Sequence, residues 1–438
     1  MRPEVQARIN RAVLELDAWF DTMRTPDGYG GPVVHWWRDG LLFTGTGLDW
    51  RYEGIIIGYL TLYARTGDEG WLAKACRAGN DLVRGQLPTG NFRNSCFEFN
   101  PHTGGTPHEA ACDLALLRLA RVLREQGDRR WEQYALVAER NLRSYHIKKL
   151  WNPELSGFGD SPNNPAFTSN KSATIVEALW ELWALWEDEE IIARYALPTL
   201  DTMLRHQASA SGHRLDGAID QSSLAGKQAW RFFPFYNARC IPALLKGYAY
   251  TRLPRYLEAA QRAMSFILLH RLPDGSFPQV IYGNGRMNRY PQWIAGVGDI
   301  LRAMELVSEM GIDAPVGDTL AWMLNGLDRS GAIRTAHGFV CQVSQREAPQ
   351  LPEFRDVLPV CGWADKAFRY LTSRIPHRSE LGSAAISETR LDCLYRGQTA
   401  EYREDAMAIE LWLKGKMIYR HRKGSAWAET WVPGEGIP

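Results

Sequence analysis

The tetrapeptide Asp274-Gly275-Ser276-Phe277 is one of six polar–glycine–apolar turns along the 438-residue chain. The other five are Asp27-Gly28-Tyr29, Thr89-Gly90-Asn91-Phe92, Ser156-Gly157-Phe158, Asp216-Gly217-Ala218-Ile219 and Ser330-Gly331-Ala332-Ile333. Successive glycines are 62, 67, 60, 58 and 56 residues apart. One Asp-Gly pair signals only a turn, but six such turns at near-constant spacing indicate a repeated structural unit.

Two helical patterns fill each repeat, because apolar residues recur at three- and four-residue steps. The pattern before each glycine, here called outer, covers residues 3–24, 68–86, 129–150, 189–208, 254–271 and 315–328. The pattern after each loop, here called inner, covers residues 48–66, 106–126, 170–187, 229–251, 290–310 and 355–373. Six outer–inner pairs predict an all-α fold, an (α/α)6 toroid of six helical hairpins, with residues 1–378 as one catalytic domain.

The connections within each repeat differ in length. Loops from an outer to an inner helix are long and rich in Gly, Asn, Pro and aromatic residues, whereas the return links, such as Thr66-Gly67-Asp68, are short. Long loops in a compact domain usually carry function, and here all six emerge at one end. We therefore expect the site at the N-terminal ends of the inner helices, where helix dipoles favour bound anions.

Residues 379–438 follow a different pattern. Polar and apolar residues alternate in part over Thr399-Ala400-Glu401-Tyr402-Arg403, and Lys414-Gly415-Lys416 and Lys423-Gly424-Ser425 look like turns between strands. This pattern predicts a small β-rich C-terminal appendage.

Composition narrows the possible partners. The formal net charge is +1, from 51 Lys and Arg and 50 Asp and Glu, so no general field attracts nucleic acid or an anionic membrane. No apolar run approaches the ~20 residues of a membrane span, and the first residues lack the apolar core of a secretory signal. The seven scattered cysteines include no C-x-x-C pair, which favours reduced thiols over a zinc site. We expect a cytoplasmic protein with a small-molecule or oligosaccharide substrate and no cofactor or metal; its oligomeric state stays open.

Carboxylates in the predicted loops are the candidate catalytic groups, because a pair flanking a glycosidic bond serves as general acid and base. Glu98 in the second loop and Asp160 in the third are the first candidates for proton transfer, with Asp49 and Asp216 as reserves. Asp216 precedes a turn glycine, where local bonding is its commonest role. Glu109 has a local explanation too, since Thr106-Pro107-His108-Glu109 reads as a helix-capping box.

Aromatic and polar residues of the same loops are the candidate substrate-binding groups. A pyranose ring offers an apolar face on which Trp36, Trp37 and Trp230 would stack. Arg214, Lys227 or Arg286 would pair with a substrate carboxylate. The full candidate set is Trp36, Trp37, His102, Arg214, Lys227, Gln228, Trp230, Tyr236, Arg286 and Trp293. This mixture suits a polar, carbohydrate-sized cleft better than an apolar pocket.

Several motifs are similar to those of one enzyme family. They are Leu42-Phe43-Thr44-Gly45-Thr46-Gly47, the segment 58–68 (GYLTLYARTGD), His213-Arg214-Leu215-Asp216-Gly217 and Gly226-Lys227-Gln228-Ala229-Trp230. They resemble motifs of the unsaturated uronyl hydrolases, and the resemblance extends loosely over about residues 40–310. It implies an (α/α)6-barrel glycoside hydrolase that cleaves products of polysaccharide lyases. Phe97-Glu98-Phe99-Asn100 replaces the family's His-Asp acid motif, and only the looser segment 160–164 (DSPNN) stands near its Asp-Asn-x-x-Asn, so the resemblance supports the fold and not the reaction.

Four functions are consistent with these patterns. The first is a glycoside hydrolase acting on an acidic or oligomeric sugar. The second is a polysaccharide lyase or uronate epimerase, in which Tyr236, Tyr282, His102 or Asn94 would abstract a proton beside a neutralised carboxylate. The third is an isoprenoid cyclase-like toroid, which ranks lower because the chain contains no Asp-x-Asp-Asp motif. The fourth is a sugar-binding protein without activity.

Overall fold

Twelve helical segments alternate between an inner and an outer ring in the computed structural model. The structure describes residues 2–34, 42–43, 46–95, 105–209, 212–224, 227–341, 350–425 and 428–430. The inner helices are α2 (Arg51–Thr66), α4 (Ala110–Glu125), α6 (Ser169–Trp186), α9 (Pro234–Thr251), α11 (Val297–Ser308) and α14 (Cys361–Ser373). The outer segments are α1 (Pro3–Thr22), α3 (Glu69–Gly85), α5 (Trp131–Asn141) with η2 (Leu142–Leu150), α7 (Glu189–Ile191) with η3 (Ile192–Ala196) and α8 (Leu197–Arg205), α10 (Pro254–Leu269) and α12 (Gly317–Asn325).

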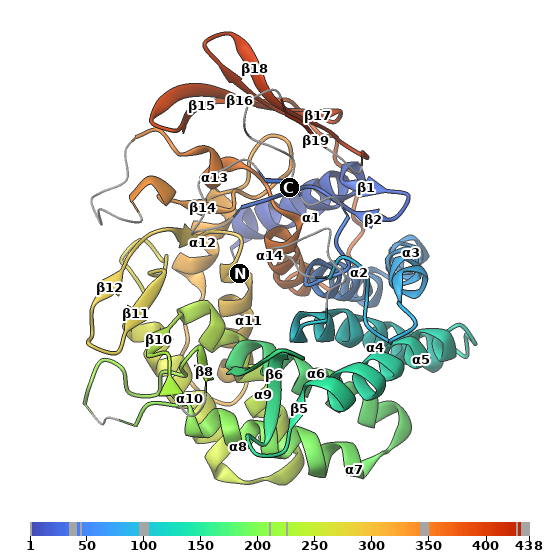
Figure 1. Cartoon of the computed structure of the whole chain (residues 1–438). Helices are drawn as coiled ribbons and strands as arrows, with labels where there is room; N and C mark the ends of the chain where they lie inside the picture. The colour runs from blue at the N-terminus through green and yellow to red at the C-terminus, as the bar shows by residue number, and fades with distance from the viewer. Residues whose placement is uncertain are drawn as a thin grey trace.

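The inner ring is closed. Each inner helix packs against the next, and α14 returns to pack against α2, so the first and last hairpins are neighbours (Figure 1). Inner helices are covered on two sides, and α6 accordingly buries residues around most of its circumference. The predicted toroid of six helical hairpins is therefore confirmed.

The repeated glycines hold neighbouring outer helices together. Gly217, Gly275 and Gly331 have φ values of 81°, 87° and 91°, a backbone conformation that residues other than glycine rarely adopt. A Cβ on these glycines would lie 2.2, 2.4 and 2.5 Å from the backbone oxygens of Arg262, Asp318 and Glu15. Each of these oxygens belongs to the outer helix of the next hairpin, so only glycine permits this approach, and the contact with Glu15 of α1 closes the ring.

Three inner helices begin at least five residues later than the sequence pattern predicts. Residues 227–232 form short strands before Pro234, and α11 begins at Val297 because Gln292–Trp293 pairs with Ala336–His337. The last pattern is divided into α13 (Phe354–Val357) and α14. Pro359 stands between them, and its ring and missing N–H do not permit a continuous helix.

The expectation of an all-α toroid with β structure only in its tail was wrong. A five-stranded sheet joins β5 (Trp151–Asn152), β6 (Gly157–Ser161), β7 (Asn164–Thr168), β8 (Ser222–Leu224) and β9 (Lys227–Gln228). A second sheet contains β10 (Arg231–Phe232), β11 (Val280–Tyr282) and β12 (Met287–Asn288), and the two-stranded sheets are β1 (Arg24–Thr25) with β2 (Gly28–Tyr29), β3 (Pro32–Val33) with β4 (Leu42–Phe43), and β13 (Gln292–Trp293) with β14 (Ala336–His337). Long loops gathered at one end leave backbone groups that must find partners, and loops of different hairpins supply them.

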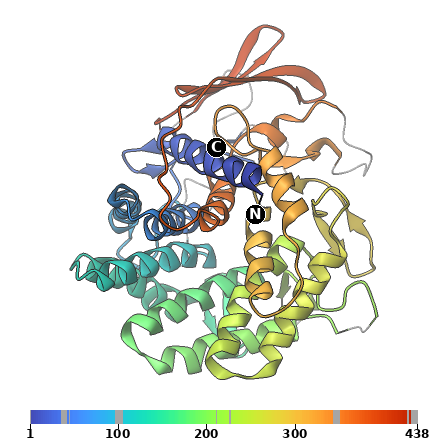
Figure 2. The same cartoon turned by 180° about the vertical axis from the view of Figure 1, so that it is seen from behind.

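The tail forms an antiparallel sheet, as predicted. Its strands are β15 (Thr389–Tyr395), β16 (Gln398–Glu404), β17 (Ala408–Leu413), β18 (Lys416–Arg422) and β19 (Ala428–Thr430). The sheet lies at the edge of the toroid in both views (Figures 1 and 2). Buried Glu404 anchors it, because this carboxylate accepts a 2.8 Å hydrogen bond from Trp19 of α1 and lies 2.8 Å from the Lys423 ammonium. The domain boundary after residue 378 stays a prediction.

Candidate active site

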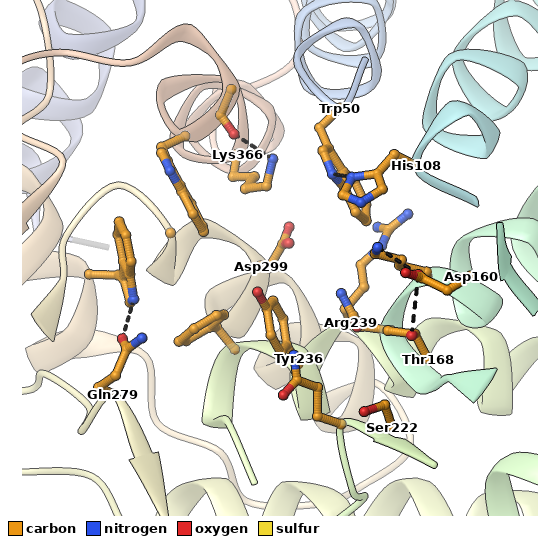
Figure 3. Close-up of a pocket in the computed structure, with 18 of the residues that line it drawn as sticks. Trp50, His108, Asp160, Thr168, Ser222, Tyr236, Arg239, Gln279, Asp299 and Lys366 are labelled. Atoms are coloured by element: carbon orange, nitrogen blue, oxygen red, sulfur yellow. Dashed lines mark hydrogen bonds and ion pairs between the residues drawn. The ribbon is translucent and has the colours of Figure 1, made fainter. Parts of the chain in front are cut away.

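A cavity of about 330 Å³ opens at the N-terminal ends of the inner helices. All six inner helices or the residues just before them contribute to its lining: Trp50 precedes α2, His108 lies in η1 (Pro107–Glu109) before α4, and Lys171, Tyr236, Asp299 and Lys366 lie early in α6, α9, α11 and α14. Figure 3 shows Trp50, His108, Tyr236, Asp299 and Lys366 converging on one space. The cavity is therefore at the end of the toroid where the sequence predicted the site.

Loop sheets supply the remaining wall of the cavity. Asp160 on β6, Asn164 and Thr168 on β7, and Ser222 on β8 all line it. Thr168 and Ser222 are paired in the sheet, which joins the third and fourth long loops beside the mouth. Backbone pairing between loops therefore fixes polar side chains that each loop alone would leave mobile.

Aromatic rings cover another side of the cavity. Trp293 and Trp363 stack with ring centroids 4.4 Å apart and planes inclined by 20°. Phe235 meets both edge-on, with centroid distances of 6.2 and 6.3 Å. The Trp293 indole N–H donates to Gln279, which fixes the ring. A rigid wall of this kind is suited to the apolar face of a sugar ring.

Asp160 faces the cavity as a hydrogen-bonded anion. The Lys171 ammonium donates to its Oδ1 at 2.7 Å, and the Thr168 hydroxyl lies 3.4 Å from the same oxygen. Both partners are themselves part of the cavity lining. The arrangement holds a carboxylate and a cation next to each other where a substrate would bind.

Asp299 forms part of the cavity floor. Burial raises the pKa of Asp299, but the neighbouring cations Arg369, Lys366, Arg239 and Arg302 outweigh burial and lower it overall. Arg369 donates to Asp299 directly. Asp299 therefore stays ionised across the ordinary pH range and acts as an acceptor or an electrostatic partner.

Arg239 is the buried cation of the floor. Its Nε donates to Thr174 at 3.0 Å, and its terminal nitrogens lie 2.9 Å from Glu53 and 3.4 Å from Glu177. Burial alone would lower the pKa of Arg239, but Glu53 and Glu177 raise it. The guanidinium thus stays charged in a nearly dry site, where its field on a ligand is weakly screened.

His108 is neutral and its tautomer is fixed. Burial, with Lys171 and Lys366 nearby, lowers the pKa of His108 well below its usual value. The Trp50 indole N–H donates to Nδ1, and since an indole nitrogen only donates, Nδ1 carries no proton. The proton is therefore on Nε2, which makes this imidazole a hydrogen-bond donor toward the cavity and not a base at that nitrogen.

The structure brings together three of the residues singled out from the sequence. Asp160, Tyr236 and Trp293 line the cavity, and their roles stay predictions. Glu98, Trp36, Trp37 and His102 lie outside the described residues.

The other candidates lie away from the cavity lining. Asp49 is buried with its Oδ1 2.8 Å from Nε of Arg51, and Asp216 accepts a 2.8 Å bond from Arg262. Gln228 donates to the Arg205 carbonyl oxygen. Arg214, Lys227, Trp230 and Arg286 are exposed. Asp49, Asp216 and Gln228 are thus held by local partners, whereas the other four side chains are exposed to solvent.

Sequence reasoning did not select Asp299, Arg239 or Lys366 as site residues. A signal for most of them exists, because polar or charged residues interrupt the first two turns of otherwise apolar inner helices. On a helix buried on all sides such a residue costs free energy unless it has partners or a role.

The six helical hairpins form a closed ring, and the cavity lies at the N-terminal ends of its inner helices. This arrangement defines an (α/α)6 toroid. No protein-family model matches the chain, and no curated protein matches its sequence. Among solved structures, a cellobiose 2-epimerase from Bacillus thermoamylovorans superimposes with a TM-score of 0.62 at 14% identity, over 84% of this chain and 98% of its own.

Two glycoside hydrolases show the same similarity. An unsaturated glucuronyl hydrolase specific for heparin has a TM-score of 0.59 at 13% identity, over 85% of this chain and 96% of its own. An α-1,6-mannanase from a Salegentibacter species, solved with α-1,6-mannotetrose, has a TM-score of 0.55 at 14% identity, over 84% of this chain and 98% of its own. At these identities the likeness shows the fold alone.

Proposed function

We propose that this chain is a carbohydrate-active enzyme, and that its reaction is hydrolysis of a glycosidic bond in an acidic or oligomeric sugar. One observation carries the proposal: a single cavity combines two carboxylates from different elements, Asp160 and Asp299, with a stacked tryptophan pair. Two carboxyl groups beside a bound sugar are what most glycosidases use. The structural neighbours, which are named as hydrolases and an epimerase of sugars, agree with this class.

The charges of the lining support an acidic substrate. Lys171, Arg239 and Lys366 face the cavity, against Asp160 and Asp299. A sugar carboxylate would pair with Lys171 and compete with Asp160 for that ammonium.

The two carboxylates then have different roles in the proposed reaction. Asp160 donates its proton to the glycosidic oxygen as the bond to the anomeric carbon breaks. Asp299 is ionised before the reaction, stabilises positive charge on the sugar ring, and takes up the proton of the attacking water as the water oxygen bonds to the anomeric carbon. His108 donates from Nε2 to a sugar oxygen, and the tryptophan pair stacks on the ring.

A second candidate reaction is epimerisation or isomerisation, and His108 is the observation that favours it. A neutral imidazole N–H can polarise a sugar carbonyl while a carboxylate removes the proton from the adjacent carbon. Asp160 would be that base, because it lies beside His108 in the same lining. The reaction releases no new sugar end, which makes it separable from hydrolysis.

One experiment tests both reactions. Purified protein is incubated in D2O with uronic-acid-containing oligosaccharides, cellobiose and α-1,6-linked mannose oligomers, and the products are followed by NMR. Hydrolysis gives new reducing ends without deuterium on carbon, whereas epimerisation or isomerisation gives deuterium on the carbon beside the carbonyl. If no substrate in the panel is converted but one binds saturably in calorimetry, the proposal of an enzyme gives way to a sugar-binding protein.

A further inference from the structure

A second cavity lies on the same axis, nearer the C-terminal ends of the inner helices. It has a volume of about 200 Å³, several times the about 30 Å³ of one water molecule in the liquid. On α11 the first cavity is lined by Asp299 and the second by Arg302 and Glu305. On α14 the corresponding residues are Lys366 and then Arg369 with Tyr370. Each pair is one turn apart, so a thin layer of side chains separates the two cavities.

Ion pairs make up this layer. Arg369 lines the second cavity and donates to Asp299, which lines the first. Glu177 also lines the second cavity and lies 3.4 Å from Arg239, which lines the first. The charges of the two cavities are thus connected through shared partners.

Three arginines and two glutamates line the second cavity: Arg118, Arg302 and Arg369, with Glu177 and Glu305. Glu181 lies within 2.7 to 2.9 Å of three cations, and Glu177 lies within 2.8 to 3.4 Å of two more. These five cations are Arg118, Arg121 and Lys246 on Glu181, and Arg302 and Arg239 on Glu177. Glu305, the second carboxylate of the lining, is bonded to Tyr370 and Arg374.

The crowding of cations lowers the pKa values of two basic groups. Burial lowers the pKa of Arg118, and Arg121 and Arg302 lower it further, although Glu181 opposes them. Burial also lowers the pKa of Lys246, and Arg118 adds to this effect. Cations therefore crowd one another at Arg118 and Lys246, whereas at Arg369 burial is outweighed by Glu53 and Asp299, which raise its pKa.

Two guanidinium groups also have unused donors. In the part of the chain that the structure describes, the buried Nε atoms of Arg118 and Arg369 have no hydrogen-bond partner. Arg369 is only 6% exposed and lines the cavity. A buried donor without a partner costs free energy, and both Nε atoms are covered by neighbouring atoms in the present arrangement.

We propose that the second cavity is a binding site for a small multivalent oxyanion, such as inorganic phosphate or the phosphate group of a small metabolite. Arg118, Arg302 and Arg369 are the binding residues, because planar guanidinium groups match the oxygens of phosphate. Glu177 is paired with Arg239 as well as with Arg302, and Glu305 is paired with Arg374, so neither glutamate stands in the cavity without a cation. The site is independent of the proposed reaction and lies on the opposite side of the ionic layer.

The test is calorimetric titration of the whole protein with inorganic phosphate at constant ionic strength in chloride. We expect saturable binding at one site. Arg118→Gln and Arg302→Gln should each lower the affinity for phosphate by about tenfold or more, because each removes one charge-assisted contact. Both variants should fold, because Glu181 keeps Arg121 and Lys246, and Glu177 keeps Arg239. Circular dichroism checks this, and Arg118→Lys, which keeps the charge without the planar fork, should bind with intermediate affinity.

Two controls locate the bound ion. Arg194→Gln removes an exposed arginine of an outer helix and should leave the affinity for phosphate unchanged. Lys171→Gln removes a cation of the first cavity and should also leave it unchanged. Absence of saturable binding overturns the proposal, as does binding that is lost in Lys171→Gln but kept in Arg302→Gln. No turnover is measured, so failure of the proposed reaction would not affect the result.

Discussion

The two ends of the toroid axis are built from the same six inner helices but differ in almost every chemical respect. The end with long outer-to-inner loops has short sheets, a tryptophan wall and amides around two carboxylates. The end with short links, such as Thr66-Gly67-Asp68, has a smaller cavity dominated by arginine and glutamate on the helices themselves. Helices provide charge in layers along the axis, whereas loops provide the shape and aromatic surface that select an organic substrate.

The comparison predicts that carboxylates at the loop end carry the reaction. Asp160→Asn and Asp299→Asn should each lower kcat by about 10²–10⁴-fold, the usual contribution of a group that transfers a proton. The Asp299 variant should still fold, because Arg369 keeps Glu53 as a partner. Steady-state kinetics on the substrate found in the panel above measures the effect.

The matched control is Asp313→Asn, an exposed aspartate in the link between α11 and α12. It should retain the kcat of the unmodified protein. Full activity in both cavity variants would remove Asp160 and Asp299 from the mechanism. Glu98→Gln belongs in the same series, and a loss confined to that variant would move the acid to the second loop.

The architecture could be predicted from the sequence because it is encoded locally and repeatedly. Glycine turns, apolar periodicity and helix starts each need only a few neighbouring residues, and the packing of Gly275 against the backbone of Asp318 explains why the turn repeats. The loop sheets could not be predicted, since β7 and β8 come from different hairpins and their pairing depends on the closed ring.

The site was predictable in position but only partly in residues. Asp160, Tyr236 and Trp293 were selected from loop composition, and they line the cavity. Asp299 and Arg239 were missed because the periodicity of an inner helix gives no sign of how deep along the axis a side chain lies. Conversely, Asp216 looks like a site residue in a list of polar loop residues, yet its partner is Arg262 of the adjacent outer helix.

A buried carboxylate of α14, Asp365, predicts a pH dependence of stability. Burial raises the pKa of Asp365 to about 7, although Lys366 opposes it. Its ordinary value is about 3.9, so between about pH 4 and pH 7 the folded state holds a proton that the unfolded state has lost. This stabilisation is complete at low pH and disappears as the pH rises through 7, which costs about 2–3 kcal/mol between pH 5 and pH 8.

Asp365→Asn tests this assignment. The amide oxygen can still accept from the Gly54 N–H, which lies 3.2 Å from the carboxylate, but the side chain no longer titrates. Chemical denaturation at pH 5 and pH 8 should show a smaller pH effect in the variant than in the unmodified protein. Part of the effect will remain, because burial also raises the pKa of Glu109 and of Asp328 to about 7. Equal pH effects in the two proteins would contradict the role of Asp365.

The tryptophan wall predicts an effect on binding more than on chemistry. Trp363→Ala removes one ring of the stacked pair at the loop end, while Trp293 keeps its hydrogen bond to Gln279. The loss of a stacking surface should raise KM by about tenfold and change kcat little, since the ring touches substrate and transition state alike. The second cavity has no tryptophan among its lining residues, so binding of phosphate should be unchanged in this variant. A fall in kcat with constant KM would instead assign the ring a role in the transition state.

The smallest effect is expected at the closed end, and it concerns stability alone. Asp68 begins α3 and accepts a 2.8 Å hydrogen bond from the Gly70 N–H, which caps the helix. Asp68→Ala should lower the free energy of unfolding by about 1 kcal/mol, the usual value of such a cap. The kcat and KM should stay unchanged, because the short links hold the ring together without touching the site. A change in turnover as large as that in the cavity variants would show that the closed end contributes to the reaction, and the division of roles between the two ends would fail.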